Sequence, residues 1–140
     1  MQICFDDSRL EQTEAGSIIG VVYFELWTAQ FPESGWTDFV AVIAGWWMAA
    51  LQRLMSGPGT SARLYFMDGP MWVVASRKTT GVLLQCTEDR TRELVVHEAV
   101  VSIAELEAEI TRFARRVVSA CARRGIETDD LRTLSAYLAR

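Results

Sequence analysis

The segment that most constrains the fold is an uncharged, tryptophan-rich stretch in the first half of the chain. No charged residue lies between Asp38 and Arg53. Apolar side chains recur through this stretch at the three- and four-residue intervals of one helical face: Trp36, Val40, Ile43, Trp47, Ala50 and Leu54. The pattern predicts a helix from Trp36 to Leu54, buried on more than one side by its own fold or by a partner. Ser34 or Gly35 is expected to cap it.

Six other segments have the β-branched and aromatic composition that is typical of strands. Two precede the helix, at Ile3–Phe5 and Ile18–Thr28. A polar turn or loop is expected between them at residues 11–17, and the second segment is apolar enough to be a central strand. Four follow the helix and are separated by short polar turns, which favour antiparallel pairing. These are Ala62–Met67, Met71–Arg77, Val82–Thr87 and Glu93–Val101.

Two further helices complete the chain. The capping box from Ser102 to Glu105 predicts a helix that ends at Gly125, and Thr128 is expected to cap a short last helix. The order is therefore β-β-α-β-β-β-β-α-α. Because alternating βαβ units are missing, this order predicts one α+β domain over residues 1–140, with an antiparallel meander sheet of five to six strands packed against helices.

Composition and cysteine spacing exclude several classes of protein. Half of the residues are hydrophobic, which argues against disorder. No uncharged apolar run approaches the roughly 18 residues of a membrane span, and the N-terminus does not resemble a signal peptide, so a cytoplasmic location is expected. Cys4, Cys86 and Cys121 are odd in number and widely spaced, which predicts free thiols rather than a disulfide framework or a zinc site.

Few residues could support catalysis. The one histidine, His97, adjoins Glu98 in a strand, where neighbouring side chains point to opposite faces. No metal-ligand or cofactor motif is present, so neither a metal nor a cofactor is expected. One alternative is an enzyme or small-molecule binder that uses a carboxylate in its pocket. The candidates are Glu25, which lies within an apolar strand, and Asp68, which lies in an Asp-Gly-Pro turn. The pocket would lie between the sheet and the Trp36–Leu54 helix.

Charge is unevenly distributed along the chain, whose net charge is −4. Residues 1–40 contain seven acidic residues and one arginine, and such an acidic end can meet a basic partner. Trp46 and Trp47 lie about 100° apart on a helix, so one of them is expected at the surface. The candidate partner-binding residues are Asp6, Asp7, Glu11, Glu14, Glu33 and Trp46.

A later helix carries several arginines. Arg112, Arg116 and Arg123 share one face, which is interpreted as a solvated surface, with contact to an anion, a nucleic acid or a protein as alternatives. No nucleic-acid-binding motif accompanies these arginines, and the chain as a whole is acidic, so no nucleic-acid partner is expected.

One combination of motifs resembles a known group of proteins. The residues that carry it are Phe31-Pro32, Trp36, Asp38-Phe39, Ile43 and Trp46-Trp47, followed by Phe66-Met67-Asp68-Gly69-Pro70. Together they resemble small cytosolic immunity proteins that are encoded beside polymorphic or contact-dependent bacterial toxins. The resemblance implies a non-catalytic protein that neutralises a cognate toxin by binding it. A homodimeric structural module, paired through the uncharged helix, is a further hypothesis.

Overall fold

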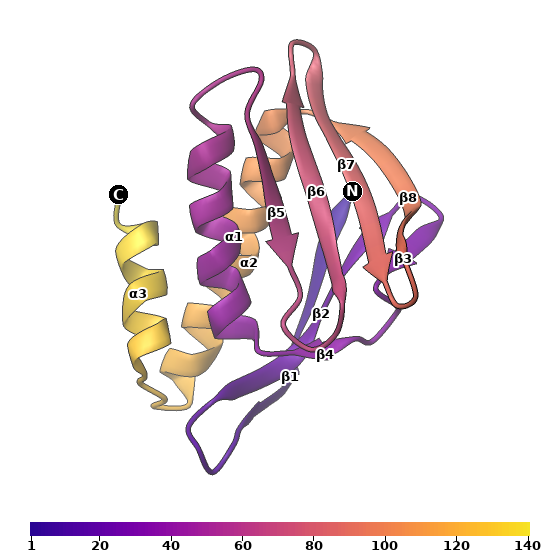
Figure 1. Ribbon diagram of the computed structural model, residues 1–140. Coiled ribbons are helices and arrows are strands. Elements are labelled where there is room, and N and C mark those ends of the chain that lie inside the picture. Colours follow the sequence, from indigo (N-terminus) through magenta and orange to yellow (C-terminus); the bar gives the residue numbers. More distant parts are fainter.

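The computed structural model describes residues 1–140 and contains two four-stranded antiparallel sheets and three helices (Figure 1). The α+β class and the order of the main elements agree with the sequence prediction. The prediction of a single sheet of five to six strands was wrong. The strands before the first long helix pair only among themselves, as do the strands after it, and the helix contacts both groups.

The first sheet is built around a central strand, β2 (Ile18–Leu26). It pairs with β1 (Gln2–Gln12), β3 (Ala29–Phe31) and β4 (Thr37–Asp38). The expected three-residue strand at Ile3–Phe5 is thus an eleven-residue strand, with an irregular register between Asp6 and Glu11. The pairing with β2 outweighs the turn preference of the polar residues in this part of β1.

The second sheet is the predicted meander. It consists of β5 (Ser61–Tyr65), β6 (Met71–Lys78), β7 (Gly81–Asp89) and β8 (Glu93–Val101), paired in chain order. Their buried side chains alternate with exposed ones, so one face of this sheet packs on the core. In Figure 1 no helix covers the other face.

The uncharged helix, α1 (Val40–Leu54), begins four residues later than predicted. Thr37 and Asp38 are paired with β2 instead, and Phe39 occupies the N-cap position without a side-chain hydrogen bond. The cap predicted at Ser34 or Gly35 was therefore wrong. The burial of α1 on several sides is confirmed, since its neighbours within the chain are β2, β5, α2 (Ile103–Arg123) and α3 (Asp129–Leu138).

Both C-terminal helices have the predicted caps. The Glu105 amide donates to Ser102 Oγ at 3.0 Å, and the Leu131 amide donates to Thr128 Oγ1 at 3.2 Å. Each cap satisfies a backbone donor that the first helical turn leaves unpaired. The three helices lie side by side, with α3 against α1 and α2 (Figure 1).

One cluster of 35 buried residues includes side chains of both sheets and all three helices. Its largest fully buried member is Trp47. The adjacent Trp46 is 41% exposed, which confirms the prediction that one of these two tryptophans lies at the surface. No helix of the structure is both long enough and apolar enough to cross a membrane.

Candidate functional site

The buried carboxylate of Asp38 joins the start of α1 to the turn between β5 and β6. Asp38 Oδ1 accepts hydrogen bonds from the amides of Phe39 (2.7 Å) and Met67 (3.2 Å). Its Oδ2 accepts from Trp36 Nε1 (3.0 Å) and from the Asp68 amide (3.2 Å). Because four donors compensate the loss of water around the carboxylate, Asp38 can remain only 1% exposed. These bonds fix the Met67–Asp68 backbone relative to α1.

A cluster of aromatic rings beneath this turn holds β5 against α1. Trp47 is fully buried, and its Nε1 donates to the Tyr65 carbonyl oxygen at 2.9 Å. Its ring lies 5.1 Å from that of Phe24, 5.4 Å from that of Phe66 and 5.3 Å from that of Phe113, measured between centroids. Such contacts each contribute about 0.5–1.5 kcal/mol beyond area burial, so the backbone of Tyr65 and Phe66 is held on a rigid base.

Large apolar side chains are exposed directly above this base. Trp46, Tyr65 and Met67 are 41%, 42% and 46% exposed, and with Phe66 they line an open depression of about 380 Å³. Across the second sheet, Tyr65, Trp72, Thr87 and Val95 are successive cross-strand neighbours; Trp72 and Thr87 are buried, and Val95 is exposed. We call the exposed set Trp46, Tyr65 and Met67 the aromatic surface.

Arg63 and the buried Trp72 lie beside Tyr65 at the edge of the aromatic surface. The Arg63 guanidinium lies 4.9 Å from the centroid of the Trp72 ring, and the Tyr65 ring lies 6.1 Å from it. Trp72 is only 8% exposed, and its buried Nε1 has no hydrogen-bond partner. An unpaired buried donor is unfavourable, and this one lies out of reach of a docked molecule unless the indole moves.

The turns at one end of the second sheet carry four acidic residues and two arginines, a net charge of −2 beside this surface. The Asp89 amide donates to the Pro70 carbonyl oxygen at 2.9 Å, which places the β7–β8 turn beside the β5–β6 turn. Asp68, Asp89 and Glu93 are exposed there. Glu88 is paired with Arg90 at 3.6 Å. We call Asp68, Asp89 and Glu93 the acidic rim.

The structure distributes the predicted partner-binding residues over several places. Trp46 belongs to the aromatic surface, and Glu33 is exposed in the turn before β4. Asp6 accepts from Ser8 Oγ (2.6 Å) and the Ser8 amide (3.1 Å), and these hydrogen bonds lower the pKa of its carboxyl.

The other three residues of the set lie along the β1–β2 hairpin. Glu11 and Glu14 are exposed. Asp7 faces α2 instead, where its Oδ2 lies 3.4 Å from Arg123 Nη2 and 3.9 Å from Arg116 Nη2. No two members of the predicted set line the same depression. Asp7, Trp46 and Asp6 each line a different one of the five principal depressions, and the other three members line none.

The two acids of the alternative pocket do not meet. Glu25 is half-buried in β2 and accepts a hydrogen bond from the Cys4 thiol at 3.7 Å, and burial is the main reason that the pKa of this thiol is raised. Asp68 is exposed in the β5–β6 turn. Neither lines one of the five principal depressions. The region between α1 and the strands is filled by Trp47, Phe24 and Phe66.

The remaining groups that could support chemistry are scattered. His97 is exposed on β8 opposite Cys86, and Glu98 accepts a hydrogen bond from Gln85 at 3.3 Å. Burial raises the pKa of the Cys86 thiol to about 12, so the thiolate form is strongly disfavoured. No three His, Cys, Asp or Glu side chains lie close enough to hold a metal ion.

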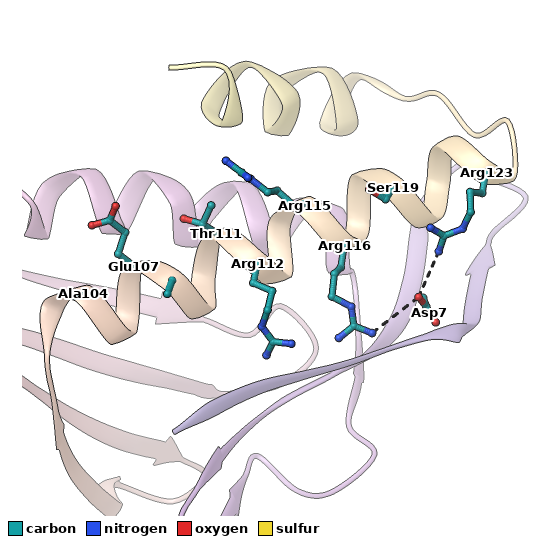
Figure 2. Close-up of a pocket in the computed structure, with 10 residues that line it drawn as sticks. Asp7, Ala104, Glu107, Thr111, Arg112, Arg115, Arg116, Ser119 and Arg123 are labelled. Atoms are coloured by element: carbon teal, nitrogen blue, oxygen red, sulfur yellow. Dashed lines mark hydrogen bonds and ion pairs between the residues drawn. The ribbon is translucent and has the colours of Figure 1, made fainter.

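Three arginines of α2, and Arg124 at its C-cap, contact β1 rather than being fully solvated. Arg112 donates to Glu109 Oε1 at 2.7 Å and to the Ile3 carbonyl oxygen at 3.2 Å, and Arg124 donates to the Leu10 carbonyl oxygen. Figure 2 shows Arg116 and Arg123 converging on Asp7 from one side of the helix. Of the acidic residues of β1, Asp7 is therefore compensated by arginines within the chain.

No protein-family model, curated protein or solved structure matches this chain. Sequence reasoning identified Trp46 but missed Tyr65 and Met67 as surface residues, and it did not predict the hydrogen bonds that the Asp38 carboxylate accepts. A signal for Tyr65 was available: buried Leu64 and Phe66 on either side require the intervening side chain of an extended segment to point outward.

Proposed function

We propose that this protein is a non-catalytic binding module, and that it acts in the cytoplasm of a bacterium as an immunity protein that neutralises a toxin by direct contact. The aromatic surface is the observation that carries the proposal. Exposed apolar groups that are contiguous and rigidly held are typical of binding sites, and tryptophan, tyrosine and arginine are enriched among the residues that dominate binding energies. Trp46, Tyr65 and Arg63 are all present here.

The acidic rim defines the chemistry of the partner. Asp68, Asp89 and Glu93 border the aromatic surface, and the protein as a whole carries a net charge of −4. A toxin domain with lysines and arginines around an apolar contact would complement this arrangement. Opposite charges steer diffusional encounter, so its association rate should fall as the salt concentration rises.

Capture followed by a growth assay tests the proposal. The tagged protein is purified from its native host, and each protein that co-elutes is then expressed alone in a heterologous bacterium. We expect one captured protein to arrest growth and co-expression of the present protein to restore it. The double variant Trp46→Ser/Tyr65→Ser should lose at least about tenfold in affinity, since residues of this kind contribute 1–2 kcal/mol or more each.

Trp27→Asn is the matched control. Trp27 is 64% exposed, lies outside the aromatic surface, and has a φ of 53°, a conformation that asparagine tolerates well. This variant should protect as well as the wild type does. An unchanged affinity of the double variant for the captured toxin would rule out the aromatic surface as the interface. If no captured protein is toxic, the immunity role is wrong even where binding is real.

The homodimer hypothesis has less support, because α1 is covered by its own fold. Eight of its residues are buried against neighbouring elements, and Trp46 is its only large exposed apolar side chain. Pairing of two copies would therefore have to use the aromatic surface rather than the whole helix. Sedimentation equilibrium distinguishes the two cases: a monomer at micromolar concentration leaves the aromatic surface free for a different partner.

A further inference from the structure

An open groove runs along the outer face of α2, with an approximate volume of 760 Å³ (Figure 2). Short side chains such as Ala104, Ala108 and Ser119 line it. Arg112, Arg116 and Arg123 extend from one side of the helix toward β1, whereas Arg115 extends from the other side toward α3. The groove shares no residue with the aromatic surface.

Most of the hydrogen-bond donors in this groove have no acceptor within the chain. A guanidinium group carries five N–H donors. Arg116 and Arg123 each make one contact with the same Asp7 oxygen, at 3.9 Å and 3.4 Å. Arg115 makes no ion pair or hydrogen bond. An acidic protein therefore presents a local surplus of positive charge here.

Asp7 shows what the groove accepts. It belongs to β1, far from α2 in sequence, and its carboxylate lies between two guanidinium groups that are seven residues apart on α2. The side chains of Asp7 and Arg116 are about equally exposed, at 41% and 37%, so solvent reaches this ion pair. A partly exposed pair of this kind contributes only about 0–1 kcal/mol, so a carboxylate from another molecule can compete with Asp7 or bind beside it.

We infer that this groove binds an acidic segment of a partner protein, through carboxylates that reach Arg115, Arg116 and Arg123. At a rise of 1.5 Å per residue, Arg112 and Arg123 lie about 16 Å apart along the helix axis. An extended segment of about five residues spans that distance. Short floor residues let the backbone of such a segment approach α2 closely.

The composition of the groove favours a peptide over a nucleic acid. No aromatic side chain lines it, so bases would have nothing on which to stack. Asp7 and Glu107 also lie in it, and both would repel a continuous phosphate backbone. A peptide can place neutral residues opposite these two acids and its own carboxylates opposite the arginines.

Fluorescence anisotropy with a labelled peptide of alternating glutamate and alanine tests the inference. The measurement is made at low ionic strength, where the Debye length is about 30 Å. Arg116→Gln/Arg123→Gln should weaken binding about fivefold or more, as expected for the loss of two solvent-exposed charge contacts. Arg90→Gln/Arg92→Gln makes the same change of net charge on the β7–β8 turn and should have little effect.

A second pair of variants separates specific contact from general attraction. Asp7→Asn frees two guanidinium groups and should tighten binding of the peptide about threefold. Asp6→Asn removes the same charge from the neighbouring residue, which bonds to Ser8 and not to α2, and should tighten it much less. Circular dichroism confirms that each variant is folded.

Three results would overturn the inference. Equal effects of Asp7→Asn and Asp6→Asn would mean that only net charge matters. Failure of the peptide to bind the Asp7→Asn variant would show that the groove is not a carboxylate site. If a labelled oligothymidylate binds more tightly than the peptide, with the same dependence on Arg116 and Arg123, the groove is a nucleic-acid site instead.

Discussion

The four hydrogen bonds to Asp38 lead to an unusual prediction: Asp38→Asn, although it keeps the shape of the side chain, should cost more than half of the stability that Asp38→Ala loses. Each carboxylate oxygen accepts two hydrogen bonds. An asparagine keeps one acceptor oxygen, and its NH₂ group must then face the other pair of donors. A buried donor without an acceptor costs about 1–3 kcal/mol, so two of them should lower the free energy of unfolding by about 3 kcal/mol.

Alanine leaves all four donors unpaired and should lower the free energy of unfolding by about 4–5 kcal/mol. Urea unfolding followed by tryptophan fluorescence measures both changes. Asp68→Asn is the control, because it makes the same chemical change at an exposed carboxylate and should alter stability by less than about 0.5 kcal/mol. An Asp38→Asn variant within about 1 kcal/mol of wild type would refute the view that these bonds hold the β5–β6 turn on α1.

Three further predictions concern the scaffold. Gly45→Ala should raise the free energy of unfolding by about 0.5–1 kcal/mol, because a helical residue gains from Ala and there is open space for the new Cβ. Gly81→Ala should lower the free energy of unfolding by more than about 1 kcal/mol, since Gly81 has a φ of +154° and its Cβ would lie 2.8 Å from a β8 carbonyl oxygen. Urea titration measures both changes. Burial raises the pKa of the Glu109 carboxyl, but hydrogen bonds from an arginine and an amide outweigh it and leave the pKa lowered. The ionised Glu109 carboxylate should therefore contribute fully to the free energy of unfolding above its unfolded pKa of about 4.3, and this contribution should disappear as the pH falls through its lower folded pKa. Glu109→Gln should accordingly lower the free energy of unfolding by about 1–2 kcal/mol at neutral pH and by little in acid. Cys86, with a pKa of about 12, should resist a thiol reagent at mildly alkaline pH until urea unfolds the protein. The half-buried Cys4, whose pKa burial also raises, should react slowly in the folded state.

The parts of the fold that could be predicted from the sequence are those that local chemistry decides. The β5–β8 meander follows from short polar turns between apolar runs, and each strand was placed within a few residues of its observed limits. The starts of α2 and α3 follow from Ser102 and Thr128, whose side chains make the expected hydrogen bonds. In each case the deciding residues are neighbours in the sequence.

The parts that could not be predicted depend on distant residues. Asp6 and Asp7 favour a turn, yet β1 continues through them, because it pairs with β2 and meets the arginines of α2 more than a hundred positions away. Trp36 has the spacing of a helical residue, but its indole donates to Asp38 and the chain there pairs with β2. The aromatic surface likewise forms only when α1 and β5 pack together.

The pairing of β1 with α2 also changes how the acidic N-terminal region should be tested as a partner-binding surface. Neutralising Asp6, Asp7, Glu11 and Glu14 together would remove negative charge and, at the same time, release Arg116 and Arg123 from Asp7. The two effects are mixed in such a variant. Asp6→Asn/Glu11→Gln/Glu14→Gln leaves Asp7 in place and alters only carboxylates that make no contact with α2.

If a basic partner approaches over the β1–β2 hairpin, this triple variant should slow association and reduce its salt dependence, while the dissociation rate changes little. If the acidic rim steers the partner instead, Asp68→Asn/Asp89→Asn/Glu93→Gln should have that effect and the hairpin variant should not. Stopped-flow association with the captured partner at two salt concentrations separates these outcomes. Unchanged rates in both variants would mean that neither set of carboxylates faces the partner, and that the aromatic surface alone would have to account for binding.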